Sequence, residues 1–142
     1  MTHAKHLMVT LCVALAALLT AVPAGAKPMK TSHLYMFGFS ASFKDSIIYV
    51  TNIQDVQGAW IDSKSKFLRH RDSYSSQLKE FLADSLQQPG RVCLVMFNVK
   101  KRKAEKQYLK LMKKYKKGYD VRYLNEKQFL FRPIDEEEEQ GQ

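Results

Sequence analysis

An apolar segment at the N-terminus limits how much of this 142-residue chain can fold into a domain. Residues 7–22 are almost wholly apolar, Lys5 precedes them, and Ala24-Gly25-Ala26 follow. This arrangement is typical of a secretory signal peptide with a small-residue cleavage site. The apolar run is shorter than the roughly 20 residues that a membrane-spanning helix needs. We therefore predict that residues 1–26 are a cleaved signal peptide, with an uncleaved signal that acts as an anchor as the less favoured alternative.

The rest of the chain, from Lys27 onward, is long enough for one domain with a modest core and too short for two. We predict a single α+β domain over residues 27–134 and a disordered acidic tail over residues 135–142. Of the two cysteines, Cys12 lies in the signal peptide and Cys93 lies in an apolar run. No intramolecular disulfide is then expected in the mature chain, and Cys93 is interpreted as a buried, inert thiol.

Period-two alternation of side chains predicts a strand from residue 33 to residue 43. Aromatic residues dominate one of its faces. That face holds His33, Tyr35, Phe37, Phe39, Ala41 and Phe43. Gly38 in the middle of the strand indicates a bulge or a close backbone contact. The β-branched and aromatic residues 47–51 follow a turn, so they are predicted to form the second strand of a hairpin.

Helical spacing of apolar residues predicts a first helix between residues 74 and 86, with Asp72 or Ser73 as its N-cap. A second helix is predicted over residues 99–117. It is expected to end at Gly118, because glycine favours the left-handed backbone that closes many helices. Both helices are therefore expected to carry one apolar stripe that packs on the sheet.

Three further segments are predicted to be strands. Residues 91–98 are apolar on both faces, which indicates a strand in the middle of the sheet or covered on both sides. Residues 119–124 are predicted to form another strand, and residues 129–132 a short last one. Two interpretations stay open for residues 52–72: a further short strand, or an ordered loop that carries Trp60 into the core.

The resulting order is strand, strand, helix, strand, helix, strand. It predicts an α+β two-layer sandwich, with a mainly antiparallel sheet of four to five strands and both helices on one face of the sheet. At the level of topology this order resembles the ferredoxin-like folds, among them the small peptidoglycan-binding domains of the sporulation-related type in bacterial envelopes. The resemblance covers residues 34–124 and carries over no binding motif.

Positive charge is the sharpest functional signal in the sequence. Residues 27–134 carry 22 Lys and Arg against 9 Asp and Glu, so the domain should attract anionic partners in a salt-dependent manner. Ten Lys or Arg lie between residues 100 and 117, where Glu105 is the only acidic residue. Most of them project from the predicted second helix opposite its apolar stripe. The candidate anion-binding residues are Lys100, Lys101, Arg102, Lys103, Lys106, Lys110 and Lys113.

The crowding of four cations at residues 100–103 favours a bound anion, because the start of a helix already repels cations and offers free N–H groups. Two other interpretations of this basic face stay open. It is either a solvated surface that favours solubility, or it is masked by the acidic residues 135–139, which would fold back on the stripe from Lys106 to Lys113.

No motif in the sequence indicates catalysis, since it has no Gly-rich phosphate loop, no metal-ligand spacing and no nucleophile elbow. We expect no catalytic residue, no cofactor and no metal, and an enzyme stays open as the least favoured alternative, for instance through His70, Asp72 and Ser73. The expected function is that of an exported bacterial binding module, periplasmic or secreted, for an anionic envelope component or an acidic protein. The alternative is a protein-interaction or assembly module that pairs through a sheet edge, or through an aromatic face around Tyr35 and Phe37.

Other classes of partner are ranked lower. Nucleic acid is a disfavoured partner because the chain is expected to be exported. Peripheral contact with a membrane stays open, and no transmembrane segment is expected in the mature chain.

Overall fold

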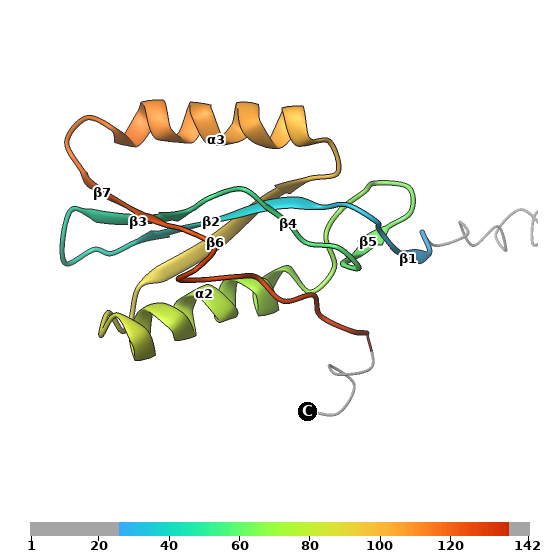
Figure 1. Cartoon of the computed structure of the whole chain (residues 1–142), viewed down its shortest axis with the longest axis horizontal. Helices are drawn as coiled ribbons and strands as arrows, with labels where there is room; N and C mark the ends of the chain where they lie inside the picture. The colour runs from blue at the N-terminus through green and yellow to red at the C-terminus, as the bar shows by residue number, and fades with distance from the viewer. Residues whose placement is uncertain (1–25, 137–142) are drawn as a thin grey trace, which may run out of the picture.

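The computed structural model of the protein describes residues 26–136 (Figure 1). The predicted signal peptide, apart from Ala26, lies outside the described residues, as do residues 137–142 of the predicted acidic tail. The described part contains seven strands and two helices. In chain order they are β1 (Pro28–Lys30), β2 (Tyr35–Ala41), β3 (Ile47–Thr51), β4 (Gln54–Asp55), β5 (Trp60–Asp62), α2 (Arg71–Ser85), β6 (Val92–Asn98), α3 (Lys101–Tyr115) and β7 (Asp120–Leu124).

β2 is the central strand of the main sheet, which has five strands. On one side it pairs antiparallel with β6 over its whole length. On the other side it pairs antiparallel with β3 and, further along, with β4. β7 lies parallel to β3. The order across the sheet is therefore β6, β2, then β3 with β4, and β7, so that β6 and β7 are the two edges.

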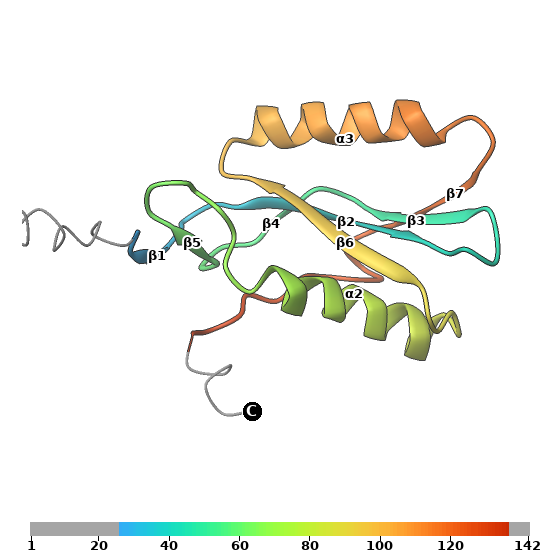
Figure 2. The same ribbon diagram turned by 180° about the vertical axis from the view of Figure 1, so that it is seen from behind.

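The two helices lie on opposite faces of the sheet (Figures 1 and 2). α2 packs on the face that carries Met36 and Val95, whereas α3 packs on the face that carries Phe39 and Val50. The predicted α+β sandwich, with two helices and a mainly antiparallel sheet of five strands, is confirmed. The prediction that both helices share one face is wrong.

Strand order is the physical reason for this difference. The connection through α2 leads from β3 across to β6, and the connection through α3 returns from β6 across to β7. Right-handed crossovers that run in opposite directions across a sheet place their helices on opposite faces. The chain therefore has three layers and departs from the expected ferredoxin-like arrangement, in which the helices would share one face.

The predicted hairpin of β2 and β3 is confirmed. The middle of its aromatic face is buried beneath α3, because Phe37 and Phe39 make ring contacts with Tyr108 and Tyr115 at centroid distances of 5.2 and 4.9 Å, whereas Phe43 is exposed. Neither Phe37 nor Phe39 is available to a partner, since they are 0% and 5% exposed. The part of the alternative function that relied on an aromatic face at Phe37 is thus ruled out by burial.

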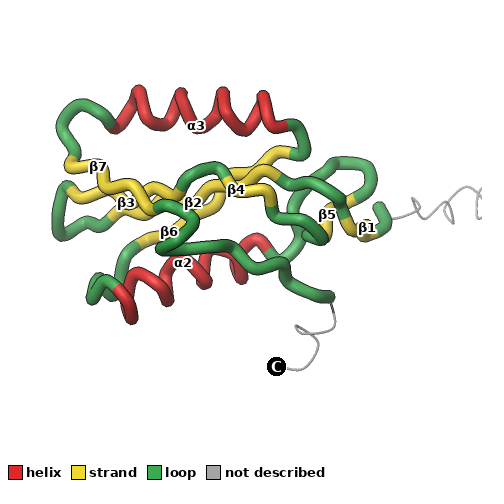
Figure 3. Tube along the Cα trace, in the orientation of Figure 1, coloured by secondary structure: helices red, strands yellow, loops and turns green. Residues whose placement is uncertain are grey.

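Residues 129–132 run beside α2 as an irregular segment and do not form the predicted strand (Figure 3). Glutamine side chains replace a neighbouring strand as hydrogen-bond partners. Gln54 Nε2 donates to the carbonyl oxygen of Phe129, and the N–H of Phe131 donates to Gln54 Oε1, both at 2.9 Å. Because a carboxamide carries one donor and one acceptor group, it can satisfy extended backbone as a strand would. Phe129 and Phe131 are buried with α2 on the same face of the sheet.

α2 begins earlier than predicted. Its N-cap is His70, which has a left-handed backbone with φ of 54° and whose carbonyl accepts a hydrogen bond from the N–H of Tyr74 at 3.3 Å. The predicted N-cap at Asp72 or Ser73 is wrong for this reason. Asp72 lies instead in the first turn of the helix, where a negative charge interacts favourably with the helix dipole.

α3 ends close to the predicted position. Its last helical residue is Tyr115, and the following turn reaches Gly118, whose φ of 89° is the left-handed conformation expected there. Neither α2 nor α3, the helices of the described part, is long and apolar enough to cross a membrane.

Residues 52–72 contain two short strands, so the strand interpretation of this segment is confirmed. β4 pairs with β2 on the same side as β3. β5 pairs with β1 in a separate two-stranded sheet. Ile61 of β5 enters the core, at 2% exposure. Trp60 is only half-buried, and the ammonium group of Lys30 lies 5.3 Å from its ring centroid.

Candidate anion-binding surface

Of the seven residues predicted to bind anions, five lie on the outward side of α3 by helical spacing (Arg102, Lys103, Lys106, Lys110 and Lys113), and Lys100 and Lys101 adjoin them at the start of the helix. Lys100 is the N-cap of α3, and the other six belong to the helix itself. Every one of them is exposed to solvent. We call this surface the basic face of α3. It consists of Lys100, Lys101, Arg102, Lys103, Lys106, Lys110 and Lys113.

The apolar stripe on the opposite side of α3 fixes the orientation of the basic face. Ala104 is fully buried, and Tyr108, Leu111 and Tyr115 pack against the sheet. Since these positions recur at helical spacing, the lysines between them have to point away from the protein. One apolar residue, Leu109, lies on the outward side and is 66% exposed.

Carboxylates of the described residues do not neutralise the cations of the basic face. Glu105 is the only acidic residue between residues 100 and 117. Among the described residues, no carboxylate lies within ion-pair distance of any of the seven cations. Neighbours four residues apart, such as Lys106 and Lys110, repel each other by a few tenths of a kcal/mol, on the order of what helix peptides show. An anion that binds across the face would relieve this repulsion.

The start of α3 concentrates the positive charge further. The N–H of Lys100 donates to Asn98 Oδ1 at 2.9 Å, while no side chain caps the helix and no acidic residue lies in its first turn. Lys100 and Lys103 also line a cavity of about 360 Å³ beside Phe67 and Phe97. The positive end of the helix dipole and four cations therefore act at the same place.

The acidic tail starts far from the basic face in the described residues. Asp135 pairs with Lys30 at 3.2 Å, and Glu136 Oε1 lies 2.5 Å from Arg69 Nε. These partners belong to β1 and to the segment before α2. The masking interpretation therefore does not hold for Asp135 and Glu136, and the remaining acidic residues lie outside the described part.

The cation Arg91 makes structural contacts inside the protein. Arg91 is 3% exposed and binds Asp45, Ser40 Oγ and the carbonyl oxygen of Ile47. This buried guanidinium ties the start of β6 to the β2–β3 hairpin, so it contributes nothing to a surface site.

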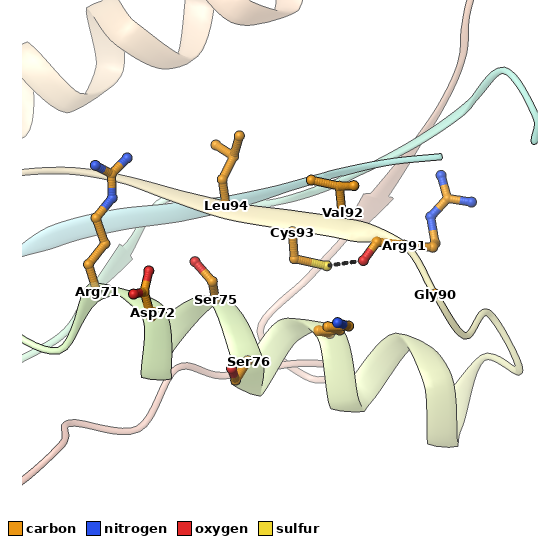
Figure 4. Close-up of a pocket in the computed structure, with 10 residues that line it drawn as sticks. Arg71, Asp72, Ser75, Ser76, Gly90, Arg91, Val92, Cys93 and Leu94 are labelled. Carbon is orange, nitrogen blue, oxygen red and sulfur yellow. Dashed lines mark hydrogen bonds between the residues drawn. The ribbon is translucent and has the colours of Figure 1, made fainter. Parts of the chain in front are cut away.

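Sequence analysis does not identify Arg71 and Lys79 as binding residues. They belong to α2, and only the fold brings them beside the edge of β6, where they line a cavity of about 500 Å³ (Figure 4). Arg71 stands in the run Arg69-His70-Arg71-Asp72, which has the composition of a polar loop. No sequence signal links these residues to β6.

The described residues contain no group of three or more His, Cys, Asp or Glu side chains placed to hold a metal ion. Cys93 lies between β6 and α2, half-buried, and its Sγ is 3.9 Å from the carbonyl oxygen of Arg91. Burial raises the pKa of its thiol above the ordinary value, which keeps the sulfur protonated and weakly nucleophilic.

Fold and surface together define a small α+β domain with one strongly basic helix face. Comparison with protein-family models, with curated proteins and with solved structures found no match.

Proposed function

We propose that the protein is an exported, non-catalytic bacterial binding module that uses the basic face of α3 to bind an anionic polymer of the cell envelope. Its place of action would be the periplasm or the exterior of the cell. The observation that carries the proposal is the unneutralised, fully exposed row of cations on a helix that the sheet holds rigidly from behind.

The spacing of the charges favours a polymer over a small ion. Outward residues such as Arg102, Lys106, Lys110 and Lys113 recur every three or four positions, so their side chains follow one another at about 5–6 Å along the helix. A chain of closely spaced phosphate or carboxylate groups can contact several of them at once. A single small anion would contact one or two.

The ligand chemistry is therefore repeated anionic groups on a flexible chain or on a surface. Inorganic polyphosphate represents the polymer, and vesicles with anionic lipid headgroups represent the surface. Binding to polyphosphate that weakens about a hundredfold between 50 and 200 mM salt would fit contacts with about five phosphates. Binding to vesicles alone would replace the polymer by a membrane surface as the ligand.

The variant that tests the proposal carries Lys106→Glu, Lys110→Glu and Lys113→Glu in the full chain. All three side chains are exposed, so the fold should persist, which circular dichroism would check. The control carries Lys27→Glu, Lys44→Glu and Lys127→Glu, which change the net charge equally but lie scattered over the surface. We expect only the first variant to lose retention on polyphosphate. Equal loss in both variants would show that net charge alone governs binding and would refute a dedicated face.

A further inference from the structure

The outer edge of β6 carries backbone groups that no strand satisfies. Gly38 on β2 donates its N–H to Thr51 Oγ1 at 2.9 Å, on the side of β3. Gly38 is paired in register with Val95 of β6. Because both backbone groups of a residue in an antiparallel strand point the same way, this is a non-hydrogen-bonded pair, and the N–H and C=O of Val95 point away from β2.

Two further facts agree with this direction. Arg71 Nη2 reaches the carbonyl oxygen of Val95 from outside the sheet, at 3.1 Å. Hydrogen-bonded and non-hydrogen-bonded pairs alternate along an antiparallel ladder, so the N–H and C=O groups of Cys93 and Phe97 also point away from β2. In the described residues no other strand pairs with this edge.

β6 lacks the residue types that usually prevent an edge strand from pairing with another chain. Its sequence, Val92–Asn98, contains no charged residue and no proline, although edges in natural proteins are commonly blunted by such residues. This composition predicted a strand in the middle of the sheet or one covered on both sides, and the observed edge position contradicts the first prediction. The second prediction agrees with α2 and α3 on the two faces of the sheet, but helices on the faces leave the backbone groups along the outer edge of β6 without a partner strand in the described residues.

The two sides of this edge differ in chemistry. On the side of α2, the cavity of about 500 Å³ is lined by Arg71, Asp72, Lys79, Cys93 and small polar residues, and it reaches Val92 and Leu94 of the strand itself. On the other side, Val92 and Leu94 point away from α2 (Figure 4). They are 52% and 38% exposed and form an apolar hollow of about 160 Å³ with Phe43, which is 100% exposed.

The charged side chains along the edge of β6 are mainly positive. Arg71 and Lys79 flank its middle, and Lys100 and Lys103 flank its far end. Among the residues that line the two cavities beside the edge, Asp72 is the only acidic one. Arg91 also lines the first cavity, but its guanidinium is paired with Asp45.

We propose that β6 accepts an extended peptide from another protein as an additional strand, and that this peptide alternates apolar and acidic residues. Successive side chains of a strand point to opposite faces. Apolar side chains would lie against Val92, Leu94 and Phe43, and acidic side chains would lie against Arg71 and Lys79. A peptide N–H would replace Arg71 at the carbonyl of Val95 and so free the guanidinium for a carboxylate. Main-chain bonds supply affinity in this mode and alternate side chains supply specificity.

A second copy of this chain is a poorer occupant of the edge. Two β6 strands that paired about a twofold axis would bring Arg71 and Lys79 of each copy close to their equivalents. Like charges at such an interface are unfavourable. The proposed surface shares Lys100 and Lys103 with the basic face of α3, but it does not involve Lys106, Lys110 or Lys113 and does not rest on the function proposed for that face.

The test measures fluorescence anisotropy of a labelled seven-residue peptide of alternating Glu and Val with the full chain. Two N-methylated versions, one methylated at the Glu amides and one at the Val amides, provide the matched control. Only one set of alternate amides can bond to β6, so we expect one version to bind at least about tenfold more weakly and the other to bind like the parent. Equal binding of the two versions would overturn the proposal, as would equal binding of a peptide with its Glu and Val residues in separate blocks.

Protein variants locate the site. We expect Lys79→Glu to weaken binding of the alternating peptide by about tenfold, on the order of reversing one exposed ion pair, and Lys127→Glu to leave it unchanged. The variant with Lys106→Glu, Lys110→Glu and Lys113→Glu should keep peptide binding, which separates this proposal from that for α3. A concentration-dependent dimer that Val92→Lys disrupts, without any peptide binding, would overturn the proposal in favour of a second copy.

Discussion

The side chain of Leu78 fills the space that a Cβ atom on Gly38 would need. Leu78 Cδ2 lies 2.6 Å from that position, and Phe131 Cζ lies 3.0 Å from it. α2 and the segment after β7 can therefore approach β2 this closely only because residue 38 has no side chain. The same residue donates its N–H to Thr51, which fixes the backbone against β3.

Gly38→Ala should lower the free energy of unfolding by about 1–3 kcal/mol, because the added methyl group forces a packed core apart. Denaturant titration of the variant and the parent would measure this. In a Leu78→Ala background the same replacement should cost less, since the colliding methyl group is gone. Strictly additive effects of the two replacements would contradict the collision.

A special role for Gly38 was predictable, whereas the groups packed against it and the layers of the fold were not. A glycine inside a strand with clear alternation indicates a bulge or a close backbone contact, whereas side chains of Leu78 and Phe131 are packed against Gly38. The alternation of Phe37 and Phe39 also predicts the strand itself. It does not say in which direction the next crossover runs across the sheet, and that direction decides which face each helix covers. The expectation of one shared face failed at this step.

Gln54→Ala should destabilise the protein by about 2–4 kcal/mol, because it leaves the carbonyl of Phe129 and the N–H of Phe131 buried without their partner. Gln77→Ala is the matched control. Gln77 makes the same pair of bonds, both at 2.9 Å, with the backbone of Arg132, but in an exposed position. There water can replace the amide, so we expect a loss below about 1 kcal/mol. Equal losses measured by thermal and denaturant unfolding would contradict this account.

The basic face was predictable because its residues are close together in the sequence. The groups that surround the edge of β6 were not predictable, because they come from distant segments. Lys106, Lys110 and Lys113 lie on one helix, so their common direction follows from helical spacing alone. Arg71 and Lys79 reach β6 only through the pairing of β6 with β2 and the packing of α2, which are relations between distant segments. The short strand expected at residues 129–132 failed similarly, because its hydrogen-bond partners are side chains of two other elements.

Acid should destabilise the protein partly through Asp45. The N–H of Ile47 and then the guanidinium of Arg91 hold the pKa of this carboxyl below its ordinary value near 3.8. The unfolded chain then binds more protons than the folded chain as pH falls past the ordinary value, so stability is lost toward the lower folded pKa. Asp45→Asn should flatten this part of the profile of unfolding free energy against pH. A slope identical to that of the parent between about pH 5 and pH 2 would contradict the role of Asp45.

The thiol of Cys93 should react slowly in the folded protein. Partial burial raises its pKa, so the thiolate fraction is reduced, although the side chain lines the cavity between β6 and α2. Alkylation at pH 8 would be followed in a Cys12→Ser variant, which leaves Cys93 as the only thiol. We expect the folded chain to react slower than the denatured chain by on the order of tenfold or more. Similar rates in both states would contradict a raised pKa of the Cys93 thiol in the folded protein.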